Sequence, residues 1–83
     1  MERVAYHATW CPYCLAFMEN YRSLEPEGKD EVLDDMNDPL WIEKRIDLVP
    51  TVIEYENGVE IRRLTARSGV GITRAMYEEW MKG

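Results

Sequence analysis

The two cysteines of this 83-residue chain, Cys11 and Cys14, stand only three positions apart, and this spacing limits how the chain can fold. A bridge between them would close a very small ring and constrain the unfolded chain by only about 2 kcal/mol. Disulfides therefore cannot stabilise the fold as they do in small secreted scaffolds. The chain must instead bury a hydrophobic core, for which its 46 % hydrophobic residues, with three Trp and five Tyr, are sufficient.

The length and charge of the chain narrow its class. We expect one domain over residues 1–83, because domains of this size are common and two would not fit. The net charge is −6 and the ten basic residues are scattered, which argues against nucleic-acid binding. An acidic surface of this kind favours partners with basic surfaces. Nothing in the sequence indicates association of the chain with itself, so we expect a monomer.

Apolar runs are short throughout the chain. No segment reaches the roughly 18 apolar residues that a membrane span needs, so no membrane contact is predicted. Residues 1–7 contain no apolar run long enough for a signal peptide. We therefore expect a cytoplasmic protein.

Strand-like and helix-like patterns alternate along the chain. The order β-α-β-α-β-β-α predicts an α/β fold with a mixed four-stranded sheet and helices on both faces. The first two strands should be parallel, joined by a right-handed crossover. Asn57-Gly58 is the preferred pair for a type I′ turn, which makes the last two strands a hairpin. The expected strands are residues 3–8, 31–36, 51–55 and 59–64, and the expected helices are residues 13–24, 38–47 and 72–82.

Cys11 and Cys14 lie where the first helix should begin, because Pro12 is favoured at a first helical position. There, free backbone N–H groups and the helix dipole favour a thiolate, the nucleophile of disulfide exchange. We therefore expect Cys11 to attack the substrate. Cys14 follows almost one turn later on the same side. We expect it to be more buried, with a pKa near that of an ordinary thiol, and to resolve the mixed disulfide.

Other interpretations of the two cysteines stay open. They could be inert core thiols, although Pro12 argues against this. A zinc site normally needs four ligands, and two Cys with one His are too few in one subunit, so no metal site is predicted. A second class is an iron–sulfur module in which a cluster bridges two subunits, with glutathione as an extra ligand. A third class is a non-catalytic interaction domain.

Several segments resemble the thioredoxin superfamily, and the resemblance covers essentially the whole chain. Cys11-Pro12-Tyr13-Cys14 is similar to the active-site tetrapeptide of the glutaredoxins, and Trp10 before it resembles the thioredoxins. Val49-Pro50-Thr51 resembles the segment of both families whose Pro is cis and faces the cysteines. The stretch from Tyr55 to Ile61 resembles the thioredoxin hairpin. The resemblance implies the thioredoxin fold and a protein-disulfide reductase whose redox-active disulfide needs no bound cofactor.

The same resemblance implies a substrate-binding surface around Cys11. Trp10 and Tyr13 would flank the thiol beside Pro12, and packing is an equally open role for Trp10. Val49 would offer backbone groups to an extended substrate, a form of strand addition. Pro50 and Thr51 would complete that edge, with an ordinary trans Pro50 as the alternative.

To predict the electron donor, we compare this chain with the positions at which glutaredoxins bind glutathione. Ala8 stands where those proteins often carry Lys. Asp47 stands where they often carry a basic residue, and its charge would repel a glutathione carboxylate. The segment 69–73 lacks the Asp that follows their two glycines. These departures imply a thioredoxin-like protein recharged by a flavin-dependent reductase, with glutathione as the alternative co-substrate. Small redoxins of this build include those that serve ribonucleotide reductase, which is therefore a candidate partner beside other protein disulfides.

Two more residues carry open hypotheses. Arg67 could bind a carboxylate at the edge of the site or be a solvated loop residue. The buried Asp that thioredoxins place six residues before the first Cys is Ala5 here, so proton transfer to Cys14 must use water or another group. His7 is a candidate to tune Cys11, because histidine changes charge near neutral pH. Its alternative is a strand residue that points away from Cys11.

Overall fold

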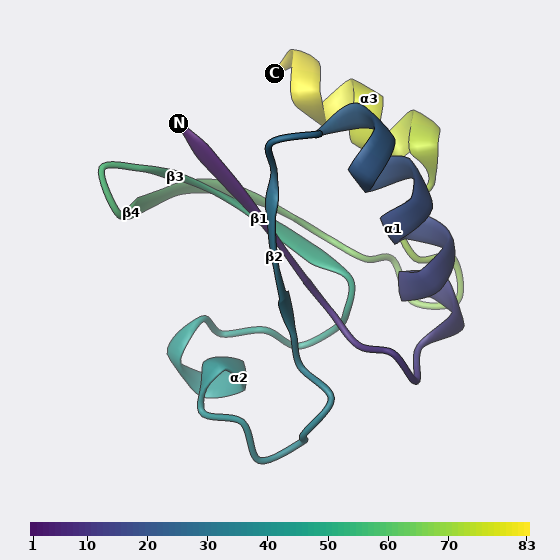
Figure 1. Ribbon diagram of the computed structural model, residues 1–83, viewed down its shortest axis with the longest axis vertical. Helices are drawn as coiled ribbons and strands as arrows, with labels where there is room; N and C mark the ends of the chain where they lie inside the picture. Colours follow the sequence, from purple (N-terminus) through teal and green to yellow (C-terminus); the bar gives the residue numbers. More distant parts are fainter.

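The computed structural model describes residues 1–83, and the predicted element order is confirmed. Four strands and three helices alternate as β-α-β-α-β-β-α (Figure 1). The strands are β1 (Glu2–His7), β2 (Lys29–Val32), β3 (Thr51–Glu56) and β4 (Val59–Thr65); the helices are α1 (Pro12–Leu24), α2 (Leu40–Glu43) and α3 (Arg74–Lys82).

The four strands form one mixed sheet in the order β2-β1-β3-β4. β1 and β2 are parallel, with Val4 opposite Lys29 and His7 opposite Val32. β3 runs antiparallel to both β1 and β4. The predicted mixed sheet is therefore confirmed, and β1, which leads directly into the two cysteines, lies inside it.

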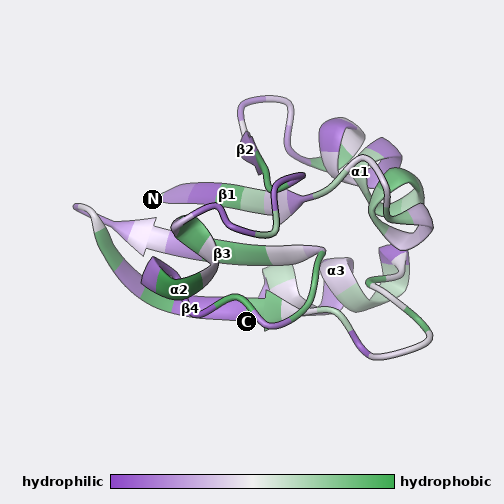
Figure 2. Cartoon of the chain, turned by 90° about the horizontal axis from the view of Figure 1, so that it is seen from below, coloured by the Kyte–Doolittle hydropathy of each residue, from purple (hydrophilic) through white to green (hydrophobic).

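Each face of the sheet carries its own hydrophobic cluster, as the alternation of side chains along a strand requires. Ala5 and Val52 face α1 and α3, where Phe17, Tyr21 and Tyr77 pack on them. The hydrophobic middle of the sheet and the apolar side of α1 are visible in Figure 2. On the opposite face the cluster includes Val4, Tyr6, Ile53, Leu33 and Ile46, with Leu40 and Trp41 of the α2 segment partly buried against it.

The hairpin between β3 and β4 has the turn that its sequence predicts. Asn57 and Gly58 have φ angles of 54° and 81°, and Glu56 pairs with Val59 across them. Asn tolerates a positive φ better than most residues, and Gly has no Cβ to clash. The turn sets the register of β4 against β3 near the hairpin, and an irregularity between Glu54 and Tyr55 shifts it by one residue farther along.

The second strand and the second helix differ from their predicted ranges. β2 ends at Val32 instead of extending to residue 36, because it begins earlier, opposite Val4. Leu33 then leaves the strand and is fully buried. α2 is a single turn, not a helix over 38–47, and the chain reverses at Arg45, whose φ is 52°. Ile42, inside the helix predicted over 38–47, is 83 % exposed.

The last helix is also shorter than predicted at its start. Thr73 caps α3 by accepting a hydrogen bond from the Met76 N–H, so the helix begins at Arg74 and not at Ile72. Ile72 is nevertheless buried, in the loop before the helix. None of the three helices combines the length and apolarity that crossing a membrane requires.

Candidate active site

Cys11 occupies the N-cap of α1. Its sulfur accepts a hydrogen bond from the backbone N–H of Cys14 at 3.3 Å, and Pro12 follows at the first helical position as predicted. The capping contact places this sulfur at the positive end of the helix dipole. Cys11 is 7 % exposed and Cys14 is fully buried. Cys11 is therefore the more accessible of the two thiols, and the expected difference in burial is confirmed.

Cys14 is not an ordinary thiol, and that part of the prediction is wrong. Burial raises the pKa of Cys14 to about 12, and the hydrogen bond with Cys11 adds to the rise. A hydrogen bond from the Ala8 backbone opposes it and lowers the Cys14 pKa. The spacing of the two cysteines predicted that Cys14 lies on the buried side of the helix. It did not indicate how completely Cys14 is buried, and the extent of burial determines its pKa.

The segment before β3 lies against Cys11. The peptide bond between Val49 and Pro50 is cis, as expected. The Cys11 thiol donates to the Val49 carbonyl oxygen, with 3.7 Å between sulfur and oxygen. The Val49 N–H donates no backbone hydrogen bond within the protein. Val49 therefore combines a carbonyl at the nucleophile with a free donor beside it.

Pro50 and Thr51 are both buried in this arrangement. The Thr51 hydroxyl donates to the Leu48 carbonyl oxygen at 2.6 Å, which ties the loop to the start of β3. The Thr51 side chain therefore holds the loop and does not face a substrate.

Trp10 and Tyr13 flank the cysteines as exposed aromatic side chains. Trp10 is 53 % exposed, and its indole N–H donates to the Asp34 carbonyl oxygen at 3.1 Å. Tyr13 is 46 % exposed, and its hydroxyl donates to the Gly69 carbonyl oxygen at 3.0 Å. Pro12 between them is also exposed. Each ring is held by one hydrogen bond while its apolar surface stays accessible.

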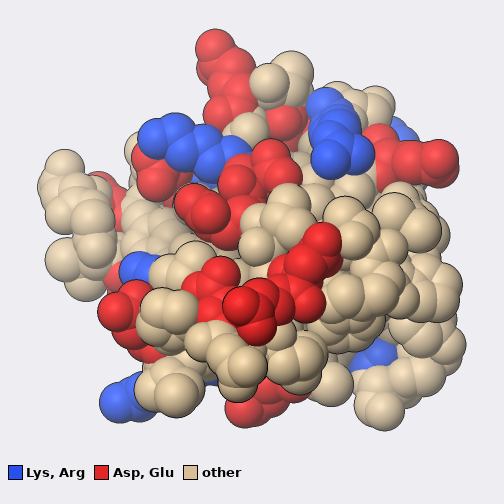
Figure 3. All heavy atoms as spheres, turned by 60° about the horizontal axis from the view of Figure 1, so that its bottom comes forward, with Lys and Arg blue, Asp and Glu red and all other residues tan.

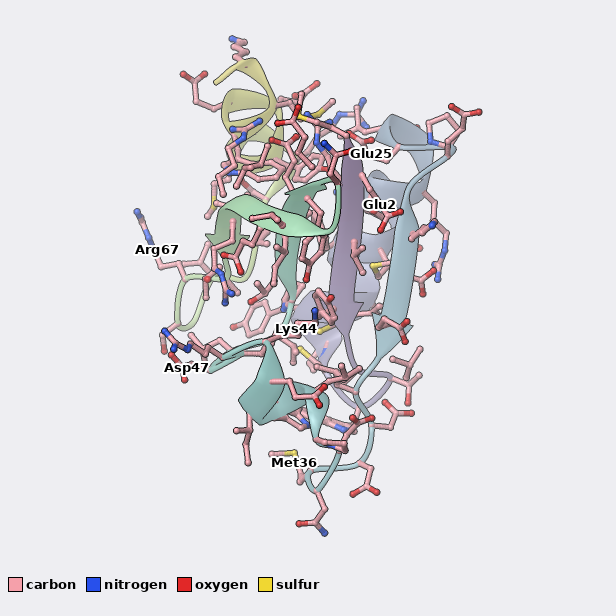
Figure 4. The ribbon with its side chains drawn as sticks, turned by 90° about the vertical axis from the view of Figure 1, so that its left-hand side faces the viewer. Glu2, Glu25, Met36, Lys44, Asp47 and Arg67 are labelled. Carbon is pink, nitrogen blue, oxygen red and sulfur yellow. The ribbon has the colours of Figure 1, made fainter.

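A small cleft of about 160 Å³ opens on the Tyr13 side of the site. Arg67 is its one charged lining residue, and the Arg67 side chain extends away from the body of the protein (Figure 4). Backbone hydrogen bonds in both directions between Arg67 and Gly71 keep the loop in place. The residues that line the cleft are Tyr13, Leu48, Val49, Ala66, Arg67, Ser68, Gly69 and Gly71.

Asp34 is a residue of this site that the sequence analysis did not single out. Its two carboxylate oxygens accept from the Thr9 N–H and the Thr9 hydroxyl, each at 2.7 Å. These hydrogen bonds hold the pKa of Asp34 below its usual range. Together with the Trp10 indole bond they fix the loop that leads into Cys11. The available signal was the Asp34-Asp35 pair inside the predicted strand 31–36, where aspartate is disfavoured.

The structure also shows where His7 lies, and where the two positions compared with glutaredoxins, Ala8 and Asp47, lie. His7 is buried, and its ring is turned to Asp30 of β2, 2.7 Å away. Ala8 is fully buried, so no long basic side chain fits at that position. Asp47 is exposed, ahead of the cis peptide bond (Figure 4).

Acidic side chains predominate on the face shown in Figure 3, with basic ones toward its margins. This distribution agrees with the net charge of −6 and favours a basic partner surface. The structure contains no group of three or more His, Cys, Asp and Glu side chains that could hold a metal ion.

The solved structures that follow share this architecture, and each is a thioredoxin. The thioredoxin of Plasmodium falciparum superposes with a TM-score of 0.75 at 18 % identity, over 98 % of this chain and 82 % of that one. Thioredoxin 1 of Thermosipho africanus gives 0.67 at 21 % identity, over 99 % and 96 % of the two chains. A Schistosoma mansoni thioredoxin gives 0.71 at 23 % identity, over 96 % and 74 %.

This chain has the thioredoxin fold. No protein-family model matches its sequence, and no curated protein does either. At identities of 18 to 23 % the structural likeness establishes the fold, and the chemistry must be argued from the site.

Proposed function

We propose that this protein is a thiol–disulfide oxidoreductase that reduces protein disulfides through Cys11 and Cys14. The observation that carries the proposal is the position of the Cys11 sulfur. It caps α1, lies 3.7 Å from the Val49 carbonyl oxygen and is the more exposed of two thiols on one helical turn. The more accessible thiol of a closely spaced pair at a helix amino end is the expected nucleophile of disulfide exchange.

In the first step the Cys11 thiolate attacks one sulfur of the substrate disulfide. A bond forms between that sulfur and Cys11, and the other substrate sulfur leaves with the electron pair as a thiolate. The free Val49 N–H and the exposed rings of Trp10 and Tyr13 support binding of an extended substrate segment across the site.

In the second step Cys14 loses its proton and attacks the Cys11 sulfur. The Cys11–Cys14 bond forms, and the substrate sulfur leaves as a second thiolate. The substrate has then gained two electrons and the protein has become a disulfide. The two residues between the cysteines allow this ring to close without unfolding α1.

For regeneration we propose a flavin-dependent reductase of the thioredoxin-reductase kind, with glutathione as the second candidate. The buried Ala8 and the acidic Asp47 support this order, because neither offers a cation to a glutathione carboxylate. As a reductant the protein suits a reducing compartment such as the cytoplasm. A ribonucleotide reductase is one disulfide substrate to test.

The proposal is tested by reduction of insulin with dithiothreitol as the electron source. We expect the wild-type protein to accelerate precipitation of the insulin B chain and Cys11→Ser to abolish that acceleration. Cys14→Ser should instead form a stable mixed disulfide with the substrate, detectable by mass spectrometry. A wild-type protein that does not accelerate the reaction would contradict the proposal.

The donor is tested in the same preparation with a glutathione mixed disulfide, glutathione reductase and NADPH. Slow turnover beside active insulin reduction supports a thioredoxin-like donor. Rapid turnover would make glutathione the donor.

A further inference from the structure

The only histidine of the chain, His7, is buried under the first helix. It lies at the end of β1, is 6 % exposed, and its Nε2 is 2.7 Å from Oδ2 of Asp30. Ala5 pairs with Asp30 across the parallel strands, and Ala5 and His7 point to the same face of β1. That face is the one α1 covers, because Ala5 belongs to the cluster that includes Phe17 and Met18.

Cys14 lies close to this histidine. The Ala8 backbone, which directly follows His7, hydrogen-bonds to the Cys14 thiol. Ala8, Cys11 and Cys14 also form one buried cluster. The Asp34 carboxylate acts electrostatically on Cys14 and is acted on by His7. The Cys14 thiol therefore lies against the backbone at the end of β1, at the residue that directly follows His7.

Cys14 needs a proton acceptor in the second step of the exchange. Because burial raises the pKa of Cys14 far above neutrality, almost none of this thiol is ionised at pH 7. The titratable groups that face this space are Asp30 from β2, Asp34 from the following loop, His7 from β1 and Cys11 from α1. Both Asp34 oxygens already accept from Thr9, and Asp30 is bonded to the His7 ring. His7 is the group that remains.

We propose that His7 accepts the proton of Cys14 and that Asp30 is its positioning residue; this inference rests on the proposed function. The Asp30 carboxylate accepts from Nε2–H, which leaves the lone pair on Nδ1 free for a proton. As Cys14 attacks Cys11, its proton passes to Nδ1, and the electron pair of the breaking bond leaves with the substrate sulfur. Asp30 then balances the charge of the imidazolium.

The two steps can be timed separately with dithiobis-nitrobenzoate as the disulfide substrate. Attack by Cys11 releases one coloured thionitrobenzoate, and attack by Cys14 on the mixed disulfide releases the second. We expect His7→Gln to leave the first phase unchanged and to slow the second at least about tenfold at neutral pH, since general bases contribute about a hundredfold or more. The Gln amide keeps a polar group opposite Asp30.

The pH profile separates proton transfer from a structural role. In His7→Gln the rate of the second phase should become proportional to hydroxide concentration. The difference in this rate between the variant and the wild type should therefore disappear as the pH rises toward the pKa of Cys14. Asp30→Asn should slow the same phase by a smaller factor. The matched control is Glu31→Gln. Glu31 follows Asp30 in β2, and its side chain points to the other face of the sheet, so this change should affect neither phase.

The unique histidine also gives a direct signal. In NMR at neutral pH, the ring-proton signals of His7 in the reduced protein should move in Cys14→Ser relative to the wild type. Equal slowing of both phases, or an unchanged second phase in His7→Gln, would overturn the inference. Absence of the first phase in the wild-type protein would instead overturn the proposed function.

Discussion

The thiol of Cys11 donates to the carbonyl oxygen of Val49, and this contact joins two segments 38 positions apart. It brings the amino end of α1 to the loop that precedes β3. The nucleophile therefore lies beside a stretch of backbone that is not part of the sheet. Under the proposed function, an extended substrate would pair with that backbone while its disulfide reaches Cys11.

Cys14 should make the stability of the reduced protein depend on alkaline pH. Its pKa is raised to about 12 by burial, whereas the unfolded chain ionises near 9. The unfolded state therefore releases this proton first, so the contribution is constant below pH 9 and is lost as pH rises above it. By pH 10 the reduced wild type should lose roughly 1 kcal/mol more than Cys14→Ala.

Urea unfolding of both proteins at pH 8 and pH 10 with excess reductant measures this difference. Burial also raises the tyrosine pKa values, but those tyrosines are common to both proteins. Equal losses in the two proteins would contradict the burial of Cys14.

Glu54 should stabilise the fold at neutral pH and lose that effect in acid. Its nearly buried carboxylate accepts from Arg62 and Arg3, each at 2.8 Å, and Arg62 lies over the Trp80 ring. The hydrogen bond with Arg62 is the main cause of its lowered pKa. A lowered carboxyl pKa stabilises the fold above the ordinary Glu range, and that stability disappears as pH falls through the folded-state pKa.

Glu54→Gln should therefore cost about 2 kcal/mol at neutral pH and less in acid, because it leaves two guanidinium groups without their partner. Glu60→Gln is the matched control. Glu60 pairs with Arg63 at the surface, 37 % exposed, so its loss should cost at most about 1 kcal/mol. Denaturant unfolding at two pH values compares the variants, and equal costs would show that the Glu54 network adds nothing.

Gly71 should be required for the position of Tyr13. Its φ is 79°, and a Cβ there would lie 2.8 Å from the Tyr13 Cβ. Gly69 has nearly the same φ, 76°, with nothing within 4 Å of its added Cβ. The two Gly→Ala changes therefore share the backbone strain of about 1 kcal/mol, and only Gly71→Ala also displaces the ring.

We expect Gly71→Ala to destabilise the protein by about 1 kcal/mol more than Gly69→Ala, because packed neighbours must shift to admit a methyl group. It should also lower the rate of insulin reduction, which Gly69→Ala should leave near that of the wild type. Thermal unfolding and the insulin assay measure the two effects. Identical behaviour of the variants would mean that Tyr13 moves freely.

The fold was predictable from the sequence wherever a local pattern is typical of only one structure. Asn57-Gly58 specified its turn, and Pro12 specified the start of α1. β2 was misplaced because Lys29 and Asp30 have low strand propensity, and only pairing with β1 makes them a strand. The helix predicted over 38–47 shortened to one turn because the chain turns at Arg45 to bury Ile46.

The site was predictable in its cysteines and less so in its surroundings. Cys11, Cys14 and the cis peptide before Pro50 followed from spacing and resemblance. The contacts of Asp34 with Thr9 and of His7 with Asp30 join β1 to the segment formed by β2 and its following loop. No local spacing encodes such contacts, because they depend on the register of two strands that are joined through a helix.

The charge at Asp47 should limit the use of glutathione. Asp47→Lys replaces a negative charge by a positive one at the position where glutaredoxins often carry a base. At about 8 Å in water each unit of charge changes the interaction with a carboxylate by about 0.5 kcal/mol, so the KM for a glutathione mixed disulfide should fall about fivefold. The effect should shrink as salt is added, since the screening length becomes shorter. Glu56→Lys makes the same charge change at the far end of β3 and serves as the control. An equal fall in KM for both variants would indicate a general effect of net charge, and no fall for Asp47→Lys would show that glutathione does not approach this side of the site.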